Sequence, residues 1–144
     1  MAAITRITVR IRTGDRAGAG TDGNVFLGID GREFRIDSNI DDYERNSNPT
    51  YVLGEFTPGE RTVNNAARND PRVDYVLDSD HLNTFHVYVR FDPENESDAW
   101  NLESVTVEVS SHADLVARYE ALGGSNNLWL GQRFGKFCYL FRSR

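Results

Sequence analysis

The chain has 144 residues, of which 39% are hydrophobic and 26% are charged, and its formal net charge is −6. These values fit one globular domain, residues 1–144, that can bury a core without disulfides, and they exclude a disordered chain. The acidic balance argues against a nucleic-acid binder, which normally carries a basic stripe, and no apolar run approaches the 18 residues that a transmembrane helix needs.

In the first part of the chain, alternating apolar and polar residues predict strands with one buried face. Residues 7–11 alternate in this way, and residues 25–29 repeat the pattern after a turn-rich loop at 14–23. Asp30-Gly31 is a typical two-residue hairpin turn, and residues 34–36 continue on the return strand. We therefore expect an antiparallel arrangement from the start of the chain.

The middle of the chain has a weaker pattern. Residues 51–53 form a short apolar run, and residues 54–72 contain two prolines and two glycines and indicate a long loop. Loops of this length in compact domains are usually functional or mobile. Residues 73–77 are predicted as an edge strand.

The second half returns to strand patterns. Strands are predicted at residues 85–91, 100–109, 128–130 and 137–141, with a polar loop at 92–98. Many short strands separated by turns predict an all-β protein with the architecture of an antiparallel β-sandwich.

One segment, residues 111–122, departs from this pattern and is predicted to be a short amphipathic helix. Leu115, Val116, Tyr119 and Leu122 stand at helical spacing, and Gly123-Gly124 follows as a helix stop.

Two loops carry the residues that a hard cation prefers. The loop at 18–24 offers the Asp22 carboxylate with the oxygens of Thr21 and Asn24, and the loop at 92–98 is also rich in oxygen ligands. Calcium takes six to eight such ligands, and alternate loops of a sandwich gather at one end. The pattern is thus consistent with a calcium site, although ordinary solvated turns have the same composition.

The features of an enzyme are missing from the sequence, so we expect no catalytic activity. There is no G-x-S-x-G nucleophile motif, the only cysteine, Cys138, lies in an apolar strand, and His86 lies on the polar side of a strand. Of the two tryptophans, Trp100 is expected in the core, and Trp129 could instead enter a lipid interface. The first residues lack a signal peptide, which favours a cytoplasmic protein, either free or bound peripherally to a membrane.

The segments 7–15 and 18–26, ITVRIRTGD and GAGTDGNVF, resemble the opening of a PLAT domain (polycystin, lipoxygenase, alpha-toxin). The segments 85–92, 100–107, 128–130 and 137–140 are similar to later landmarks of that family. The resemblance implies an eight-stranded sandwich of two four-stranded sheets, here with the helix inserted. It also implies a non-catalytic module that docks to membranes or protein partners, often with calcium.

Carried over by position, the resemblance implies a set of calcium ligands in two loops: Gly18, Gly20, Thr21, Asp22, Asp92 and Asn95. Gly18 stands where some members have an acidic side chain, which implies a weaker site. The long loop 54–72 and the helix 111–122 exceed the minimal family pattern.

The leading hypothesis is therefore a calcium-responsive module that docks to a lipid membrane or a protein partner. Two alternatives remain: a calcium-supported carbohydrate- or protein-binding sandwich without lipid affinity, and an enzyme of unrecognised type. Calcium-dependent binding to vesicles, binding to glycans and substrate turnover, respectively, distinguish the three.

Overall fold

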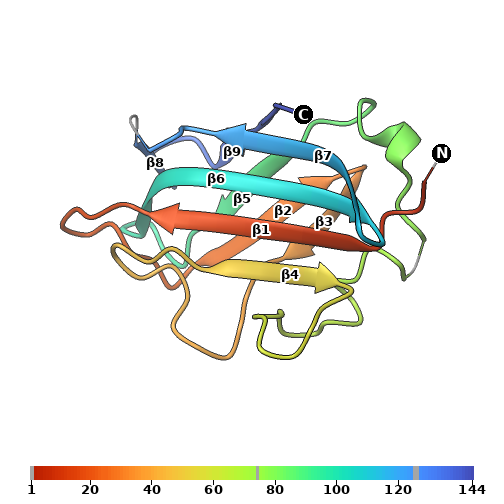
Figure 1. Cartoon of the computed structure of the whole chain (residues 1–144). Coiled ribbons are helices and arrows are strands. Elements are labelled where there is room, and N and C mark those ends of the chain that lie inside the picture. The colour runs from red at the N-terminus through yellow and green to blue at the C-terminus, as the bar shows by residue number, and fades with distance from the viewer. Residues whose placement is uncertain (1, 74, 125–126) are drawn as a thin grey trace.

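The computed structural model describes residues 2–73, 75–124 and 127–144, and it is a sandwich of two antiparallel sheets (Figure 1). The all-β prediction is confirmed. The described residues form one 3-10 turn, η1 (Ser79–His81), and these strands: β1 (Arg6–Thr13), β2 (Asn24–Ile29), β3 (Arg32–Arg35), β4 (Thr50–Gly54), β5 (Tyr88–Asp92), β6 (Ala99–Ser111), β7 (Asp114–Ala121), β8 (Leu128–Gly131), β9 (Phe137–Tyr139) and β10 (Phe141–Arg142).

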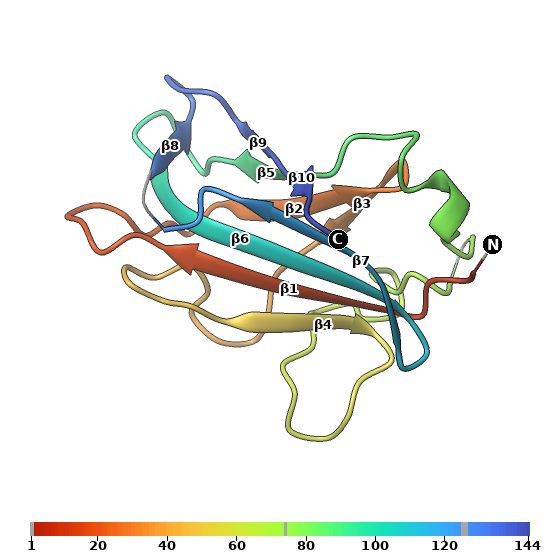
Figure 2. The same ribbon diagram turned by 45° about the horizontal axis from the view of Figure 1, so that its top comes forward.

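The large sheet has the strand order β10-β7-β6-β1-β4, with β8 paired to β6, and the small sheet has the order β3-β2-β5-β9. Figure 2 shows β4, β1, β6 and β7 side by side in one layer, with β2, β3 and β5 in the other. The expected four strands are present in each sheet. Two short strands, β8 and β10, extend the large sheet to six, because the chain end folds back along β6 and β7.

The predicted helix at 111–122 is wrong, because this segment contains β7. It pairs antiparallel with β6, for example Val107 with Tyr119 and Val109 with Ala117. His112 makes the turn between the two strands at φ 53°. The alternate residues Ala117, Tyr119 and Ala121 are buried, so the segment also carries a two-residue apolar period. The long strand β6 offers a whole edge of backbone groups to pair with, and this pairing decides between the two periods.

The hairpin predicted at Asp30-Gly31 is confirmed. Both residues have positive φ, 53° and 76°, and Ile29 faces Arg32 across the turn. Two successive positive φ angles define a type I′ turn, whose twist matches that of the flanking strands. The predicted edge strand at 73–77 is not formed, since residues 73 and 75–77 belong to no strand.

The core lies between the sheets and consists of the alternating residues of β1, β2, β5 and β6. Trp100 is fully buried, as expected, and its indole Nε1 donates to Thr13 Oγ1 at 2.9 Å. Cys138 is also buried, and burial raises the pKa of its thiol, which keeps it protonated and unreactive. Trp129 is half-buried.

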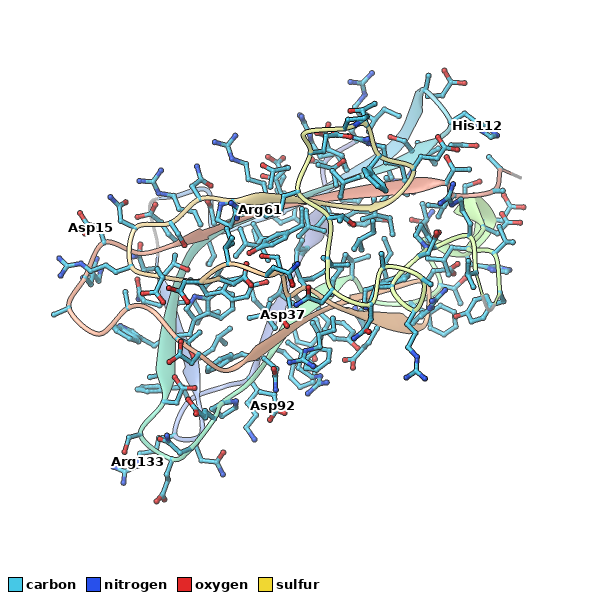
Figure 3. All side chains as sticks on the ribbon, turned by 90° about the horizontal axis from the view of Figure 1, so that it is seen from below. Asp15, Asp37, Arg61, Asp92, His112 and Arg133 are labelled. Atoms are coloured by element: carbon cyan, nitrogen blue, oxygen red, sulfur yellow. The ribbon has the colours of Figure 1, made fainter. Side chains whose placement is uncertain are left out.

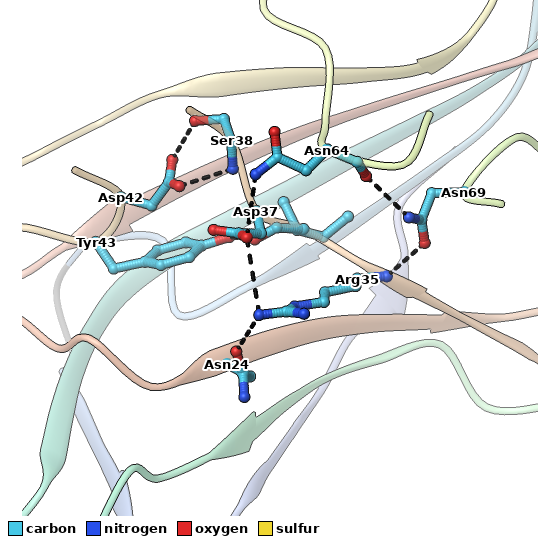
Figure 4. Close-up of polar contacts among 9 residues, drawn as sticks. Asn24, Arg35, Asp37, Ser38, Asp42, Tyr43, Asn64 and Asn69 are labelled. Carbon is cyan, nitrogen blue, oxygen red and sulfur yellow. Dashed lines mark hydrogen bonds and ion pairs between the residues drawn. The ribbon is translucent and has the colours of Figure 1, made fainter. Parts of the chain in front are cut away.

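The long loop that follows β4 is held in place by polar contacts (Figure 4). The Arg35 backbone amide donates to Asn69 Oδ1 at 2.8 Å, and Asn69 Nδ2 donates to the Asn64 carbonyl at 3.2 Å. Asn64 Nδ2 donates to Asp37 Oδ2 at 3.3 Å. The loop is therefore a folded part of the domain, attached to the end of β3.

A charged pair attaches the same loop to β1, and it predicts acid sensitivity. Arg6 Nη1 donates to Glu60 Oε1 at 2.9 Å, and this contact together with the Thr57 amide lowers the pKa of Glu60 from 4.5 to about 2. A carboxyl group with a lowered pKa stabilises the fold above its ordinary pKa, and this stabilisation is lost as the pH falls from 4.5 towards 2.

We expect Glu60→Gln to be less stable than the wild type at pH 7 in urea unfolding. The difference should shrink at pH 3, and an equal difference at both pH values would contradict the assignment.

Candidate functional site

An open hollow of about 540 Å³ lies at the end of the sandwich where the β1–β2 and β5–β6 loops meet. We call it the tip pocket. Its lining comes from three segments of the chain: Gly18, Ala19, Gly20, Thr21, Asp22, Glu44, Arg45, Glu94, Asn95, Ser97 and Asp98.

Asp98 joins the two loops. The buried Thr21 hydroxyl donates to Asp98 Oδ1 at 2.7 Å and accepts a hydrogen bond from the Gly23 amide at 2.9 Å. The other carboxylate oxygen, Oδ2, accepts from the Glu94 amide at 2.8 Å. One side chain therefore sets the position of the first loop relative to the second.

A third segment, residues 43–45, closes one side of the pocket. The Thr21 amide donates to the Tyr43 carbonyl at 3.0 Å. The backbones come so close that a Cβ on Gly20 would stand 3.0 Å from the Arg45 nitrogen and 3.1 Å from the Tyr43 carbonyl oxygen. Only glycine leaves this approach unstrained, which explains why a glycine stands in the middle of the loop.

The pocket is acidic. Four carboxylates, those of Asp22, Glu44, Glu94 and Asp98, face one guanidinium, that of Arg45, which is paired with Asp15 at 2.9 Å. The Asp22 carboxylate makes no hydrogen bond or ion pair to any residue in the described ranges. The arrangement therefore offers a free negative charge beside loop carbonyls, which are ligands suited to a hard cation.

These side chains do not form a compact metal cluster. Within residues 2–73, 75–124 and 127–144, no three His, Cys, Asp or Glu side chains are grouped so that they could hold an ion. A cation in the tip pocket would thus depend on loop carbonyls as well as on carboxylates. This fits a calcium site of modest affinity better than a tight one.

Five of the six expected ligand residues line the same pocket: Gly18, Gly20, Thr21, Asp22 and Asn95. The sixth, Asp92, ends β5 in register with Asn24 and is not among the lining residues. The Asn95 side-chain oxygen accepts from the Ser97 amide at 2.9 Å and so already has a partner.

Sequence reasoning missed three acidic residues of the lining. Asp98 and Glu94 lie inside the polar loop at 92–98, and their place in that loop is the sequence signal that could have identified them. Glu44 belongs to a polar segment without a motif, so only the folded chain brings it to the pocket.

A second hollow, of about 290 Å³, adjoins the tip pocket and shares Ser97 and Asp98 with it. Its other wall is the β8–β9 turn, where Phe134 is 53% exposed and Arg133 is its neighbour. Figure 3 shows Arg133 and Asp15 at the same end of the molecule, with His112 at the opposite end. An apolar side chain and a basic one therefore stand beside the acidic loops.

The strands and loops just described fall within a segment that matches a known protein family. A model of the PLAT/LH2 domain matches residues 7–118, which includes both loops of the tip pocket. The chain belongs to the PLAT/LH2 domain family. The resemblance drawn from the opening motif is thereby confirmed.

In several solved structures, one part of a longer chain has the same fold as this protein. The alpha-toxin from Clostridium absonum has a TM-score of 0.59 and 21% identity, over 97% of this chain and 32% of the toxin. Coral 8R-lipoxygenase has a TM-score of 0.56 and 19% identity, over 95% of this chain and 17% of the enzyme. The Clostridium perfringens alpha-toxin from an avian strain has a TM-score of 0.52 and 17% identity, over 99% and 32%.

The chain thus spans about a third of the toxins and about a sixth of the lipoxygenase. At these identities the likeness establishes the fold. A comparison with curated proteins gives no match. No helix in the described part of the PLAT domain is long and apolar enough to cross a bilayer.

The contacts of the tip pocket predict that two of its aspartates differ in their effect on stability. Asp98→Ala leaves the buried Thr21 hydroxyl and the Glu94 amide without their acceptor, and we expect a loss of about 1–3 kcal/mol in the free energy of unfolding. Asp22→Ala removes an exposed carboxylate that has no partner among the described residues, and we expect a change within about 0.5 kcal/mol. Urea unfolding in the presence of a chelator measures both. An Asp22→Ala variant as unstable as Asp98→Ala would mean that Asp22 supports the loop.

Proposed function

We propose that this PLAT domain is a non-catalytic, calcium-responsive module that docks to a membrane surface through its tip. The observation that carries the proposal is the convergence of acidic loops on one open pocket next to an exposed phenylalanine in a basic turn. Coral 8R-lipoxygenase, a structural neighbour, is described as activated by calcium through a C2-like domain, and this supports the proposal by analogy.

Calcium would be held by oxygen atoms of the tip pocket. The proposed ligands are the Gly18, Gly20 and Thr21 backbone and the Asp22 carboxylate, with Asn95 from the second loop. Asp92, the sixth residue of the family pattern, lies outside the lining of the pocket and would have to turn towards the ion to bind it. Asp98 and Glu94 add carboxylates that the family pattern did not predict. Because Gly18 brings no carboxylate and Asp98 is engaged by Thr21, we expect an affinity on the order of micromolar to millimolar.

Charge explains why calcium would control docking. The chain carries a net charge of −6, so anionic headgroups repel the metal-free domain. A bound divalent cation neutralises the tip and can bridge to lipid phosphate. The β8–β9 turn then reaches the interface with Phe134, whose ring would enter the headgroup region, and with Arg133 and Lys136, which favour anionic lipid.

Calcium should stabilise the fold. At a concentration of about a hundred times the dissociation constant, a bound ion adds about 2.7 kcal/mol to the free energy of unfolding. We expect the melting temperature of the wild type to rise with calcium and much less with magnesium, which gives up its waters reluctantly. Asp22→Ala should abolish the rise. The matched control is Asp114→Ala, an exposed aspartate at the start of β7, which should keep it. A wild-type melting curve that calcium does not move would exclude the metal site.

Vesicle binding tests the second half of the proposal. Sedimentation with vesicles of phosphatidylcholine and phosphatidylserine should retain the domain in calcium and release it in EGTA. Phe134→Ala should weaken retention by about tenfold while the calcium-dependent rise in melting temperature stays intact, because Phe134 lies outside the tip pocket. Phe56→Ala, with the same 53% exposure in the loop after β4, is the control. Calcium binding without vesicle binding would leave a protein partner as the target.

A further inference from the structure

The outward face of the small sheet carries a cluster of aromatic rings away from the tip. Tyr88 on β5 stands directly opposite Tyr139 on β9, and the next outward position of β9 is Phe137. With Phe85 and His86, these rings line a hollow of about 310 Å³, which we call the aromatic cleft. Three of its rings are largely exposed: Phe85 at 50%, Phe137 at 42% and Tyr139 at 61%.

The rings of the cleft form a floor and a wall. Tyr88 lies across Gly28, so close that a Cβ there would stand 2.1 Å from its Cζ, and its ring therefore covers the sheet. The Phe137 and Tyr139 rings are nearly parallel, at 10°, and stand at 61° and 62° to Tyr88. A flat ring could rest on the floor and touch the wall at the same time.

Charged ligands are disfavoured in the cleft, because the charged side chains beside its Tyr88 floor are paired with one another. The Glu33 carboxylate accepts from Arg90 at 2.8 and 2.9 Å and from the Tyr88 hydroxyl at 2.7 Å. The Arg90 contact lowers the pKa of Glu33, and burial raises the pKa of Tyr88 to about 12, so this arrangement persists at neutral pH. No free carboxylate is left among these residues to attract a cation.

Arg32, at the rim of the cleft, is similarly committed. Its guanidinium donates to three backbone carbonyls of the long loop, those of residues 68, 70 and 73, and it lies 4.6 Å from the centre of the Phe34 ring. A guanidinium held in this way is a poor partner for a phosphate or carboxylate. The cleft therefore suits an uncharged ligand.

Two polar groups of the cleft have no hydrogen-bond partner among the described residues: the Tyr139 hydroxyl and the His86 imidazole. Exposed aromatic faces beside unused hydroxyl and imidazole groups complement a molecule with apolar C–H faces and hydroxyl groups at its edges. A hexose ring has this chemistry. Concave sites of about 300 Å³ with few polar groups are typical of small-ligand binding.

We propose that the aromatic cleft is a binding site for a neutral glycan. One pyranose ring stacks on Tyr88 and touches the Tyr139 ring at its side, and its hydroxyl groups bond to the Tyr139 hydroxyl and to His86. The site is separate from the tip: the two hollows share no lining residue, and β2 runs from Asn24 near the tip to Ile29 in the cleft wall, about 17 Å along the strand at roughly 3.3 Å per residue. Glycan binding at this site therefore requires no calcium.

Affinity gel electrophoresis of the whole chain tests the proposal. The gels contain β-glucan, xylan or galactomannan as neutral probes and polygalacturonate as an acidic one, each with calcium or EGTA. We expect retarded migration in at least one neutral gel, unchanged by EGTA and absent in polygalacturonate. Tyr139→Ala and Phe137→Ala should each weaken this retention by about tenfold, and Tyr139→Phe, which removes only the hydroxyl, by about threefold.

The control is Phe56→Ala, an exposed phenylalanine outside the cleft, which should bind like the wild type. A normal thermal melt of each variant establishes that it is folded. Normal migration in every neutral gel overturns the proposal, and so does retention that Tyr139→Ala does not change. A dimer of the wild type that Tyr139→Ala dissociates in sedimentation also overturns it, because the face would then pair two copies. None of these results bears on the calcium and vesicle experiments, so the two proposals fail separately.

Discussion

The antiparallel pairing of β1 with β6 is the constraint on which the rest of the structure depends. The two strands pair from Arg6 opposite Ser110 to Thr13 opposite Leu102, so the end of β1 lies beside the start of β6. The loops that flank these ends must therefore meet. Backbone hydrogen bonds extend the contact beyond the strands, from the Gly14 amide to the Asn101 carbonyl at 2.8 Å and from the Asn101 amide to the Ala19 carbonyl at 3.0 Å. The tip pocket is a direct consequence of this register.

The same sandwich provides one surface with unpaired acidic side chains and one surface whose charges are paired. At the tip, loops leave the sheets and carry carboxylates such as that of Asp22, which pairs with no basic side chain in the part of the chain that the structure describes. On the outer face of the small sheet, strand side chains pair across neighbouring strands, as Glu33 does with Arg90, and aromatic rings remain. Loops can leave charges unpaired because water solvates them, whereas neighbours on a sheet face are close enough to neutralise one another. The proposed calcium and glycan sites follow from this difference.

The incorrect prediction of a helix at 111–122 shows how a local pattern can be overruled. Residues 111–122 satisfy a helical period through Leu115, Tyr119 and Leu122, and a strand period through Leu115, Ala117, Tyr119 and Ala121. A short isolated helix gains little from propensity alone, whereas pairing with the whole edge of β6 satisfies backbone groups and buries Tyr119. The twelve residues alone do not decide between the two periods, because nearly all of the partner strand β6 precedes them in the chain.

The sequence by itself determined the elements whose signals are local. The alternating strand patterns and the Asp30-Gly31 turn were sufficient for the sandwich, and the opening motif of the PLAT/LH2 family indicated four of the residues that line the tip pocket. The resemblance of the loop after Phe91 added the fifth, Asn95. Only the tertiary structure decided that β7 is a strand, that Glu44 joins the pocket and that Asp92 stays outside its lining. It also decided that Tyr88, Phe137 and Tyr139 gather around one cleft. These outcomes depend on strand register and on contacts between distant segments, and the residue types along the chain do not specify either before it folds.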